Sequence, residues 1–320
     1  MRVRERVASR FPGRFSFRGS VGVVADRPPF VSFLSDYGRA DEFVGVCHAV
    51  MLDIAPELRI VDVTHEIPPF DVRAGALALV RAIQYLPEGV VLAVVDPGVG
   101  TERRCIAVEV EHASIVGPDN GLLAPAVAML GGPRRVVEIT AEEYQLRAPG
   151  PTFAGRDVMA PAAARLAVGL PIGALGPEVD PVLLTPALVP LPDVDGEGRI
   201  TGEVLWVDRY GNCQLNVAPE QLEEVGANIG DALEITVSDA AGVGSGRRAR
   251  WVRTFADAKP AELVVLVDSY GMCAIALDRR SAAVELGVRA ASAVTVSTQA
   301  SAGHHDRGVQ VGIGRKGARA

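Results

Sequence analysis

At residues 90–100 the chain reads Val90-Val91-Leu92-Ala93-Val94-Val95-Asp96-Pro97-Gly98-Val99-Gly100. The unbroken apolar run predicts a strand, and the acid and Gly-containing turn after it predict where that strand ends. Ligands of open parallel sheets bind at the carboxyl ends of the strands. Asp96 is therefore expected at a candidate site.

Short apolar runs alternate with helical patterns on both sides of this stretch. The predicted strands are Phe30–Leu34, Arg59–Val63, Val90–Val95 and Cys105–Val110. The predicted helices are Asp41–Ile54, Asp71–Leu86, Asn120–Leu130 and Arg156–Val168. The alternation predicts an α/β N-terminal domain over residues 28–190, with a mainly parallel sheet covered on both faces.

The composition changes after this domain. Residues 191–199 are rich in Pro, Asp and Gly, which is typical of a linker. Residues 200–297 predict a smaller all-β domain, barrel-like or a sandwich, because short apolar runs alternate with Gly-containing turns. Its expected strands are Thr201–Val207, Cys213–Val217, Ala232–Val237, Arg248–Phe255, Leu263–Val267 and Cys273–Leu277. Residues 298–320 are predicted to be a flexible tail.

The composition excludes several classes of protein. Of the 320 residues 48% are hydrophobic and 22% charged, as in a globular chain, and no apolar run is long enough to span a bilayer. Four scattered cysteines indicate reduced thiols and a cytoplasmic protein. Residues 1–27 hold seven arginines and two acids and are interpreted as a basic, disordered arm, whereas the whole chain carries −7. The net negative charge of the chain argues against nucleic-acid and membrane partners.

Two acids follow the first predicted strand. Asp36 could accept hydrogen bonds from ribose hydroxyls, or it could form a local Asx turn. Asp41 could contact a cationic group, or it could cap the following helix. The sequence leaves both pairs of alternatives open.

The segment after Val95 holds a second candidate set. Asp96 and Arg103, seven positions apart, could converge on one pocket, or they could form a surface salt bridge. The loop has no Lys-Ser/Thr of a phosphate-binding loop. It partly matches the Asp-x-Gly-x-Gly-x-Gly loop of methyltransferases, but Glu102 replaces the last Gly.

No metal site is expected from the spacing of Cys and His. His65 is interpreted as a structural histidine that bonds loop backbone.

One pattern occurs twice, as Val207-Asp208-Arg209-Tyr210-Gly211-Asn212-Cys213 and Val267-Asp268-Ser269-Tyr270-Gly271-Met272-Cys273. Two similar hairpin turns explain it. Alternatively, both turns present side chains, Asn212 and Ser269, to a ligand.

Six motifs together resemble the S-adenosyl-L-methionine (SAM) hydroxide adenosyltransferase family, whose superfamily also contains the fluorinase and chlorinase. They are Phe33-Leu34-Ser35-Asp36-Tyr37-Gly38, Val61-Asp62-Val63-Thr64-His65-Glu66-Ile67-Pro68-Pro69-Phe70-Asp71-Val72, Asp96-Pro97-Gly98-Val99-Gly100-Thr101, Gly117-Pro118-Asp119-Asn120-Gly121-Leu122-Leu123, Thr152-Phe153-Ala154-Gly155-Arg156-Asp157 and Tyr210-Gly211-Asn212.

The resemblance implies a SAM hydrolase that needs no cofactor. It also implies a homotrimer with active sites between the N-terminal domain of one subunit and the C-terminal domain of its neighbour. Asp96 and Arg103 would activate water for attack at C5′ of the ribose, which gives adenosine and L-methionine. The implied substrate contacts are Asp36 on the ribose, Phe70 beside the reacting centre, Asp41 and Ser269 on the methionine part, Asn212 and Phe255 on adenine, Phe153 on the pocket floor, and Gly155 and Tyr210 within their motifs.

One position departs from the family pattern. Ala154 stands where the family usually has the His that completes the water-activating set. The first hypothesis is therefore a SAM hydrolase slowed or retuned by Ala154. The alternatives are a SAM-dependent halide (chloride) adenosyltransferase, a SAM- or adenosine-binding protein with weak catalysis, and a methyltransferase. Asp96 argues against the halide enzyme, because a carboxylate repels an incoming anion.

Overall fold

A computed structural model describes residues 29–187, 190–238 and 244–298. The chain divides into two compact units, one ending at Leu188 and the other beginning at Val189. Each unit has its own core and is described by itself. The arm predicted for residues 1–27 and all of the predicted tail except Thr298 lie outside the described residues.

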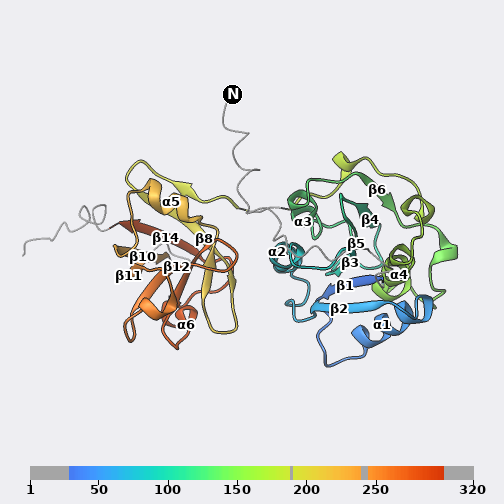
Figure 1. Cartoon of the computed structure of the whole chain (residues 1–320), viewed down its shortest axis with the longest axis horizontal. Helices are drawn as coiled ribbons and strands as arrows, with labels where there is room; N and C mark the ends of the chain where they lie inside the picture. The colour runs from blue at the N-terminus through green and yellow to red at the C-terminus, as the bar shows by residue number, and fades with distance from the viewer. Residues whose placement is uncertain (1–28, 188–189, 239–243, 299–320) are drawn as a thin grey trace, which may run out of the picture. The chain divides into compact units, whose positions relative to one another are not determined.

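The N-terminal unit is built on a six-stranded sheet in the order β2-β1-β3-β5-β4-β6 (Figure 1). Strands β2, β1, β3 and β5 are parallel, whereas β4 runs antiparallel to β5 and β6. The mainly parallel sheet is thus confirmed. The strands are β1 Phe30–Ser35, β2 Arg59–Thr64, β3 Gly89–Val94, β4 Cys105–Glu109, β5 Ala113–Pro118 and β6 Arg135–Glu138.

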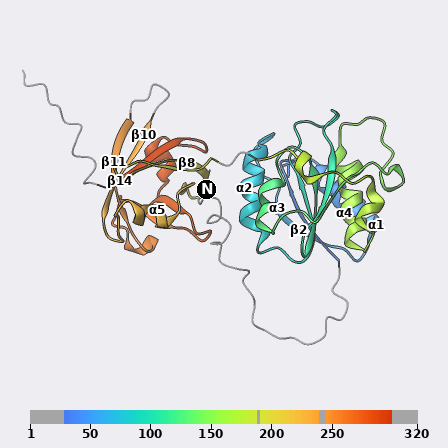
Figure 2. The same ribbon diagram turned by 90° about the horizontal axis from the view of Figure 1, so that it is seen from above.

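Helices cover both faces of this sheet, as predicted. Figure 2 shows α1 and α4 on one side and α2 and α3 on the other. Each side encloses its own apolar core, and β1 serves both, since Phe33 points into one core and Leu34 into the other. The helices are α1 Phe43–Ile54, α2 Val72–Ile83, α3 Ala124–Met129 and α4 Ala160–Ala167, the last preceded by a π-helical turn at Gly155–Met159.

The helix expected at Asn120–Leu130 begins four residues later, at Ala124. The reason is local: Asn120 donates its side-chain amide to the Val95 carbonyl and accepts the Leu122 N–H. These bonds hold residues 120–122 in a turn against the end of β3. Two strands of this sheet, β5 and β6, were not predicted, because their short mixed sequences give no clear period.

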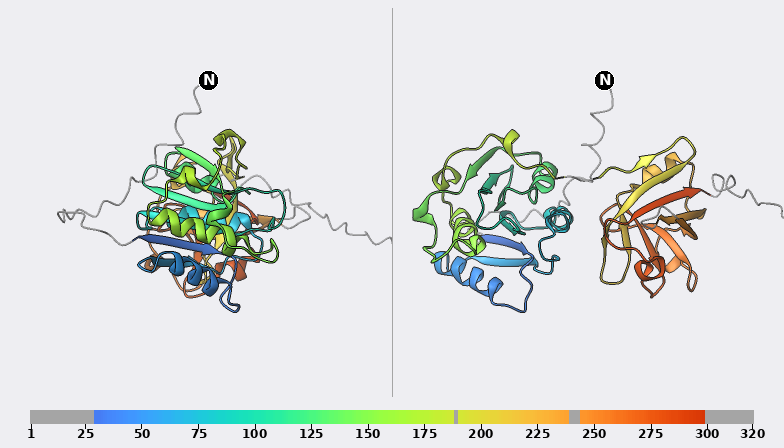
Figure 3. Two further views of the ribbon diagram at one scale, coloured as in Figure 1. Left: turned by 90° about the vertical axis from the view of Figure 1, so that its right-hand side faces the viewer. Right: turned by 180° about the vertical axis from the view of Figure 1, so that it is seen from behind.

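The C-terminal unit is an all-β barrel, which confirms the predicted class. Strands β14, β10, β11, β12, β13, β9 and β8 pair in that order, and a further β14–β8 pairing closes the ring. Figure 3 shows this unit, coloured yellow to red, from two further directions. The bounds are β8 Arg199–Val207, β9 Cys213–Leu215, β10 Ala232–Ser238, β11 Gly244–Trp251, β12 Leu263–Val267, β13 Cys273–Leu277 and β14 Ala293–Thr298, with a short β7 at Asp193–Val194 and helices α5 Pro219–Glu224 and α6 Ala282–Leu286.

The segment 191–199 contains two strand pieces, β7 and the first residue of β8. Asp195 holds the turn between them by accepting the N–H groups of Glu197 and Arg199. None of the helices in the described part of the chain has the length and hydropathy that a membrane span requires.

Candidate active site

Three parallel strands end at one edge of the N-terminal sheet. Because β1, β2 and β3 run in the same direction, the residues that follow them lie together at their carboxyl ends. Asp36 directly follows β1 and His65 directly follows β2, whereas one residue, Val95, separates Asp96 from the end of β3. The direction of β4 also brings Arg103, two residues before its start, to this edge.

Asp36 lies at the centre of this edge and holds a strained residue. Its carboxylate accepts the backbone N–H of Phe70 at 2.9 Å. Phe70 has a φ of 68° and leaves 72% of its surface exposed. A positive φ is uncommon for a bulky residue, and backbone strain of this kind clusters at functional sites. Burial raises the pKa of the Asp36 carboxyl above its usual value.

Asp96 and Arg103 form a forked ion pair. Arg103 Nε donates to Asp96 Oδ1 at 2.7 Å, and Nη2 donates to Oδ2. The side chains are only 7% and 13% exposed, and Arg103 Nη1 also donates to the Cys105 sulfur at 2.8 Å. Burial alone would lower the pKa of Arg103, but the bond to Asp96 outweighs it, so the guanidinium stays charged. The predicted Asp96–Arg103 ion pair is therefore present, and its side chains are largely shielded from solvent.

An aromatic cluster lies beside this pair. Tyr37, Phe43 and Phe153 meet edge to face at centroid distances of 5.3–5.8 Å. The Arg156 guanidinium stacks 4.9 Å from the centre of the Phe153 ring. Gly155 is buried under the cluster, and a Cβ there would overlap the Tyr37 hydroxyl. Ala154, at the start of the π-helical turn, carries no polar group into this region.

Asp41 is exposed and does not cap α1. The N-cap residue of that helix is Glu42, and no side chain bonds its first N–H groups. The capping alternative for Asp41 was therefore wrong, and Asp41 is an exposed residue two positions before Phe43 of the aromatic cluster.

The repeated pattern in the C-terminal unit forms two matching turns. Asp208 Oδ1 accepts the N–H groups of Tyr210 and Asn212, and Asp268 Oδ1 accepts those of the residues at the equivalent positions, Tyr270 and Met272. Gly211 and Gly271 adopt φ values of 84° and 82°. The hairpin interpretation is thus confirmed, and Asp is the residue that shapes both turns.

These turns still leave side chains available to a ligand. Tyr210 is 79% exposed and Ser269 is exposed, whereas Asn212 is half-buried and bonds Asp208 through its amide. Phe255 is 54% exposed and begins a 3-10 turn, Phe255–Asp257, which Thr254 caps. The strand predicted for Arg248–Phe255 therefore ends early, at Trp251.

Family models match both units. The model described as SAM hydroxide adenosyltransferase N-terminal domain matches residues 31–176, and the C-terminal domain model matches residues 202–295. The chain belongs to the SAM hydroxide adenosyltransferase family. The resemblance seen in the six motifs is confirmed.

Relatives of this family cover most of the chain. A protein of Salinispora tropica named (R)-S-adenosyl-L-methionine hydrolase is 46% identical over 262 residues, which span 81% of this chain and 94% of that protein. One of the same name from Thermus thermophilus is 42% identical and is covered over 96% of its length. A fluorinase of Actinopolyspora mzabensis is 28% identical over 295 residues.

A solved structure resembles the chain over most of its length. An uncharacterized conserved protein of Thermotoga maritima superposes with a TM-score of 0.77 at 32% identity, covering 83% of this chain and 99% of its own. The two matched regions of the SAM hydroxide adenosyltransferase family contain every predicted site residue.

Sequence reasoning missed two contributors. Cys105 accepts a hydrogen bond from Arg103, and Tyr37 fills the space next to Gly155. The position of Cys105, two residues after Arg103 at the start of a strand, was the available signal for the first. No sequence pattern indicates that Tyr37 lies next to Gly155, because this contact depends on how the π-helical turn packs.

Proposed function

We propose that this protein hydrolyses S-adenosyl-L-methionine to adenosine and L-methionine. The buried Asp96–Arg103 pair at the carboxyl edge of the sheet carries the proposal. The names of the relatives at 42–46% identity support the same activity.

The main catalytic task of the protein is to position one oxygen nucleophile for attack on C5′ of SAM. The sulfonium of SAM is a good leaving group, so no acid has to protonate it. Each oxygen of the Asp96 carboxylate keeps a free acceptor position while bonded to Arg103, so it can orient water or take its proton. The fixed guanidinium stabilises the developing hydroxide, and exclusion of bulk water strengthens both effects.

Ala154 leaves this water without the usual imidazole partner. The side chain that fills the neighbouring space is Tyr37, whose burial raises the pKa of its phenol well above the usual value. A phenol with such a pKa stays protonated and is a poor base. Turnover is therefore slower than an Asp, Arg and His set would give.

The resemblance to the family supports the remaining substrate contacts of the proposal. Asp36 binds the ribose hydroxyls, Phe70 flanks the reacting carbon, and Asp41 meets the methionine ammonium. Phe153 and Gly155 line the floor of the pocket. From the barrel, Tyr210, Asn212 and Phe255 hold adenine, and Ser269 binds the methionine part.

The active unit in this proposal is a homotrimer whose sites lie between neighbouring subunits. Large aromatic side chains implied in substrate binding are exposed on both units of a single chain, namely Phe70, Tyr210 and Phe255. Such exposure suits surfaces that become covered by a ligand and a neighbour. The four cysteines are free, which supports a cytoplasmic location, and the reaction needs no cofactor.

The test is a product analysis in labelled water. Purified protein is incubated with SAM in H₂¹⁸O, with and without chloride, and the nucleosides are separated and weighed by mass spectrometry. Attack at C5′ places ¹⁸O in adenosine. Arg103→Lys should lose the activity, and the matched change Arg104→Lys, next to it in an Asp119 pair, should keep it. A chlorinated nucleoside, or binding without turnover, would contradict the proposal.

The sulfonium of SAM is itself a stereocentre, and the relatives' name specifies the R form. The same assay run on separated R and S epimers measures which one this protein consumes.

A further inference from the structure

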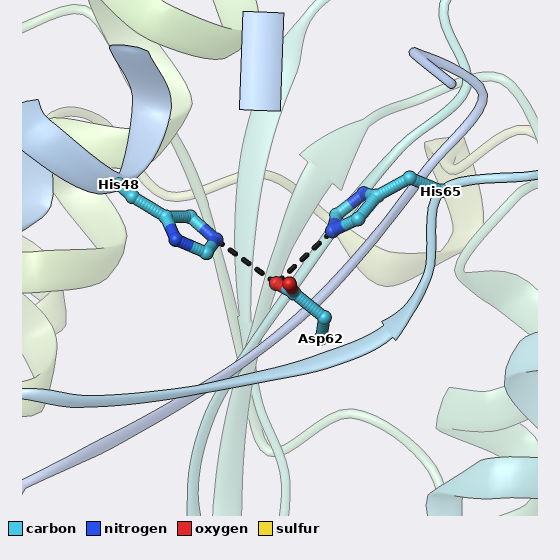
Figure 4. Close-up of side chains that lie close together, drawn as sticks. All are labelled: His48, Asp62 and His65. Atoms are coloured by element: carbon cyan, nitrogen blue, oxygen red, sulfur yellow. Dashed lines mark hydrogen bonds and ion pairs between the residues drawn. The ribbon is translucent and has the colours of Figure 1, made fainter. Parts of the chain in front are cut away.

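Three side chains outside the proposed water-activating pair converge on one point. His48 from α1, Asp62 from β2 and His65 from the loop after β2 offer ligand atoms that all lie within 4.8 Å of one another. His48 Nε2 lies 2.9 Å and His65 Nε2 lies 3.0 Å from the same oxygen, Asp62 Oδ1 (Figure 4). Spacing along the sequence gave no sign of this cluster.

His65 is held in one orientation. Its Nδ1 forms a 2.7 Å hydrogen bond with Ser35 Oγ, so the expectation that it bonds loop backbone was wrong. Its ring packs edge to face on Phe33 with centroids 4.7 Å apart. The ring therefore points Nε2, and no other polar atom, at Asp62.

That nitrogen is buried against the carboxylate. The His65 side chain has no exposed surface, and its Nε2 faces Asp62 Oδ1 as an ion-pair contact at 3.0 Å. An imidazole whose other nitrogen is bonded to a polar group, as here to Ser35, is the usual arrangement of a metal ligand.

The groups at the cluster suit a cation, because the Asp62 carboxylate lies between two imidazoles that can each bind a metal through a ring nitrogen. The exposed Arg39 guanidinium contacts only the other oxygen, Asp62 Oδ2, at 3.5 Å. Oδ1 is left to the imidazoles.

We infer that His48, Asp62 and His65 form a binding site for a divalent first-row transition-metal ion such as zinc. Two imidazole nitrogens and one carboxylate oxygen are ligands that zinc and its neighbours accept, whereas magnesium and calcium prefer oxygen alone. His48 and Asp62 are about one-quarter exposed, so the ion can enter and keep a water or another ligand in an open position.

The site would join α1 to β2 and to the loop that follows β2. Ser35, one residue before Asp36, ties that loop to the end of β1. The inference does not depend on SAM hydrolysis, because binding of the ion is measured without substrate.

The experiment titrates the untagged full chain, stripped with a chelator, with Zn²⁺ in a calorimeter and with Co²⁺ in a visible spectrophotometer. We expect one ion per chain, a Co²⁺ absorption band that Zn²⁺ abolishes, and a higher melting temperature with Zn²⁺. His48→Gln and Asp62→Asn should lose the band. Ser35→Ala should weaken binding by about 10–100-fold, since it frees the His65 ring.

Two control variants exclude other histidines. His112→Gln changes a half-exposed histidine beside Glu111, and the double change His304→Ala with His305→Ala removes the adjacent pair near the C-terminus. Both should bind Zn²⁺ as the unchanged protein does. Buried His65 is left intact, and circular dichroism confirms that each variant folds. Absence of saturable binding, or equal binding by Asp62→Asn and the unchanged protein, overturns the inference.

Discussion

The Asp36 carboxylate accepts the backbone N–H of Phe70, thirty-four residues further along the chain, and so holds Phe70 at a positive φ. One acid thereby fixes an exposed aromatic ring and keeps its second oxygen for a ligand.

We expect Asp36→Ala to remove both contributions. The KM for SAM should rise by at least tenfold, and unfolding should become easier by about 1–3 kcal/mol, since the Phe70 N–H loses its acceptor. Steady-state kinetics and urea denaturation measure the two effects. Unchanged KM would contradict the ribose role.

The same residue predicts a pH dependence. Its pKa in the folded chain is raised above the usual 3.8 by burial, so the folded state binds the proton more tightly than the unfolded state. This contribution to stability is complete below the unfolded pKa and is lost as pH rises through the folded pKa. Affinity for SAM should change in the opposite direction, because the ribose hydroxyls need the ionised carboxylate. Calorimetric binding to an inactive variant from pH 4 to 7 checks this, with Asp36→Asn as the pH-insensitive control.

Asp96→Asn keeps the shape of the acid and removes its charge. We expect kcat to fall by about 10²-fold or more, because the amide cannot take a proton and no longer anchors Arg103 in a charged fork. SAM binding should change little, since other residues hold the substrate. Single-turnover kinetics with calorimetry separate the two. A variant that retains full kcat would show that the pair is only structural.

Ala154→His restores the residue type that the family usually has at this position. We expect kcat to rise, by up to about 10²-fold if the imidazole acts as a general base. The increase should disappear as pH falls below the imidazole pKa, which separates base catalysis from a packing effect. Ala154→Phe, similar in bulk without the nitrogens, is the matched control and should not gain activity.

Gly155→Ala tests the packing beneath the aromatic cluster. The new methyl group would overlap the Tyr37 hydroxyl, and overpacking of this kind usually destabilises a fold by about 1–3 kcal/mol. Tyr37→Phe removes that hydroxyl, so the double variant should recover part of the loss. Thermal denaturation of the two single variants and the double variant gives the coupling directly. Additive effects would mean that the two side chains do not meet.

Local patterns were sufficient for much of the fold. The apolar run 90–95 predicted β3, and Asp71 marked the start of α2, where it accepts the Ala74 N–H. Strands β12 and β13 have the bounds read from the sequence. The antiparallel direction of β4 could not be predicted, because strand direction depends on pairing between distant segments and leaves no local pattern.

The residues of the candidate site were also only partly predictable from the sequence. Asp96 and Arg103 belong to one loop, so their spacing could suggest a pair. Cys105 was not expected as a partner, because thiols are seldom considered as acceptors for Arg. The cluster of His48, Asp62 and His65 comes from a helix, a strand and a loop, and only the packing of α1 beside β2 brings it together.

The β14–β8 pairing sets a limit on how far the protein can be shortened. A chain that ends after Thr298 keeps the pairings of β14 with β10 and β8. A cut that takes away Ala293–Thr298 would strip β10 and β8 of a neighbour and leave two bare strand edges, each able to recruit another chain. A stop codon before Ala293 would thus expose strand edges that favour aggregation.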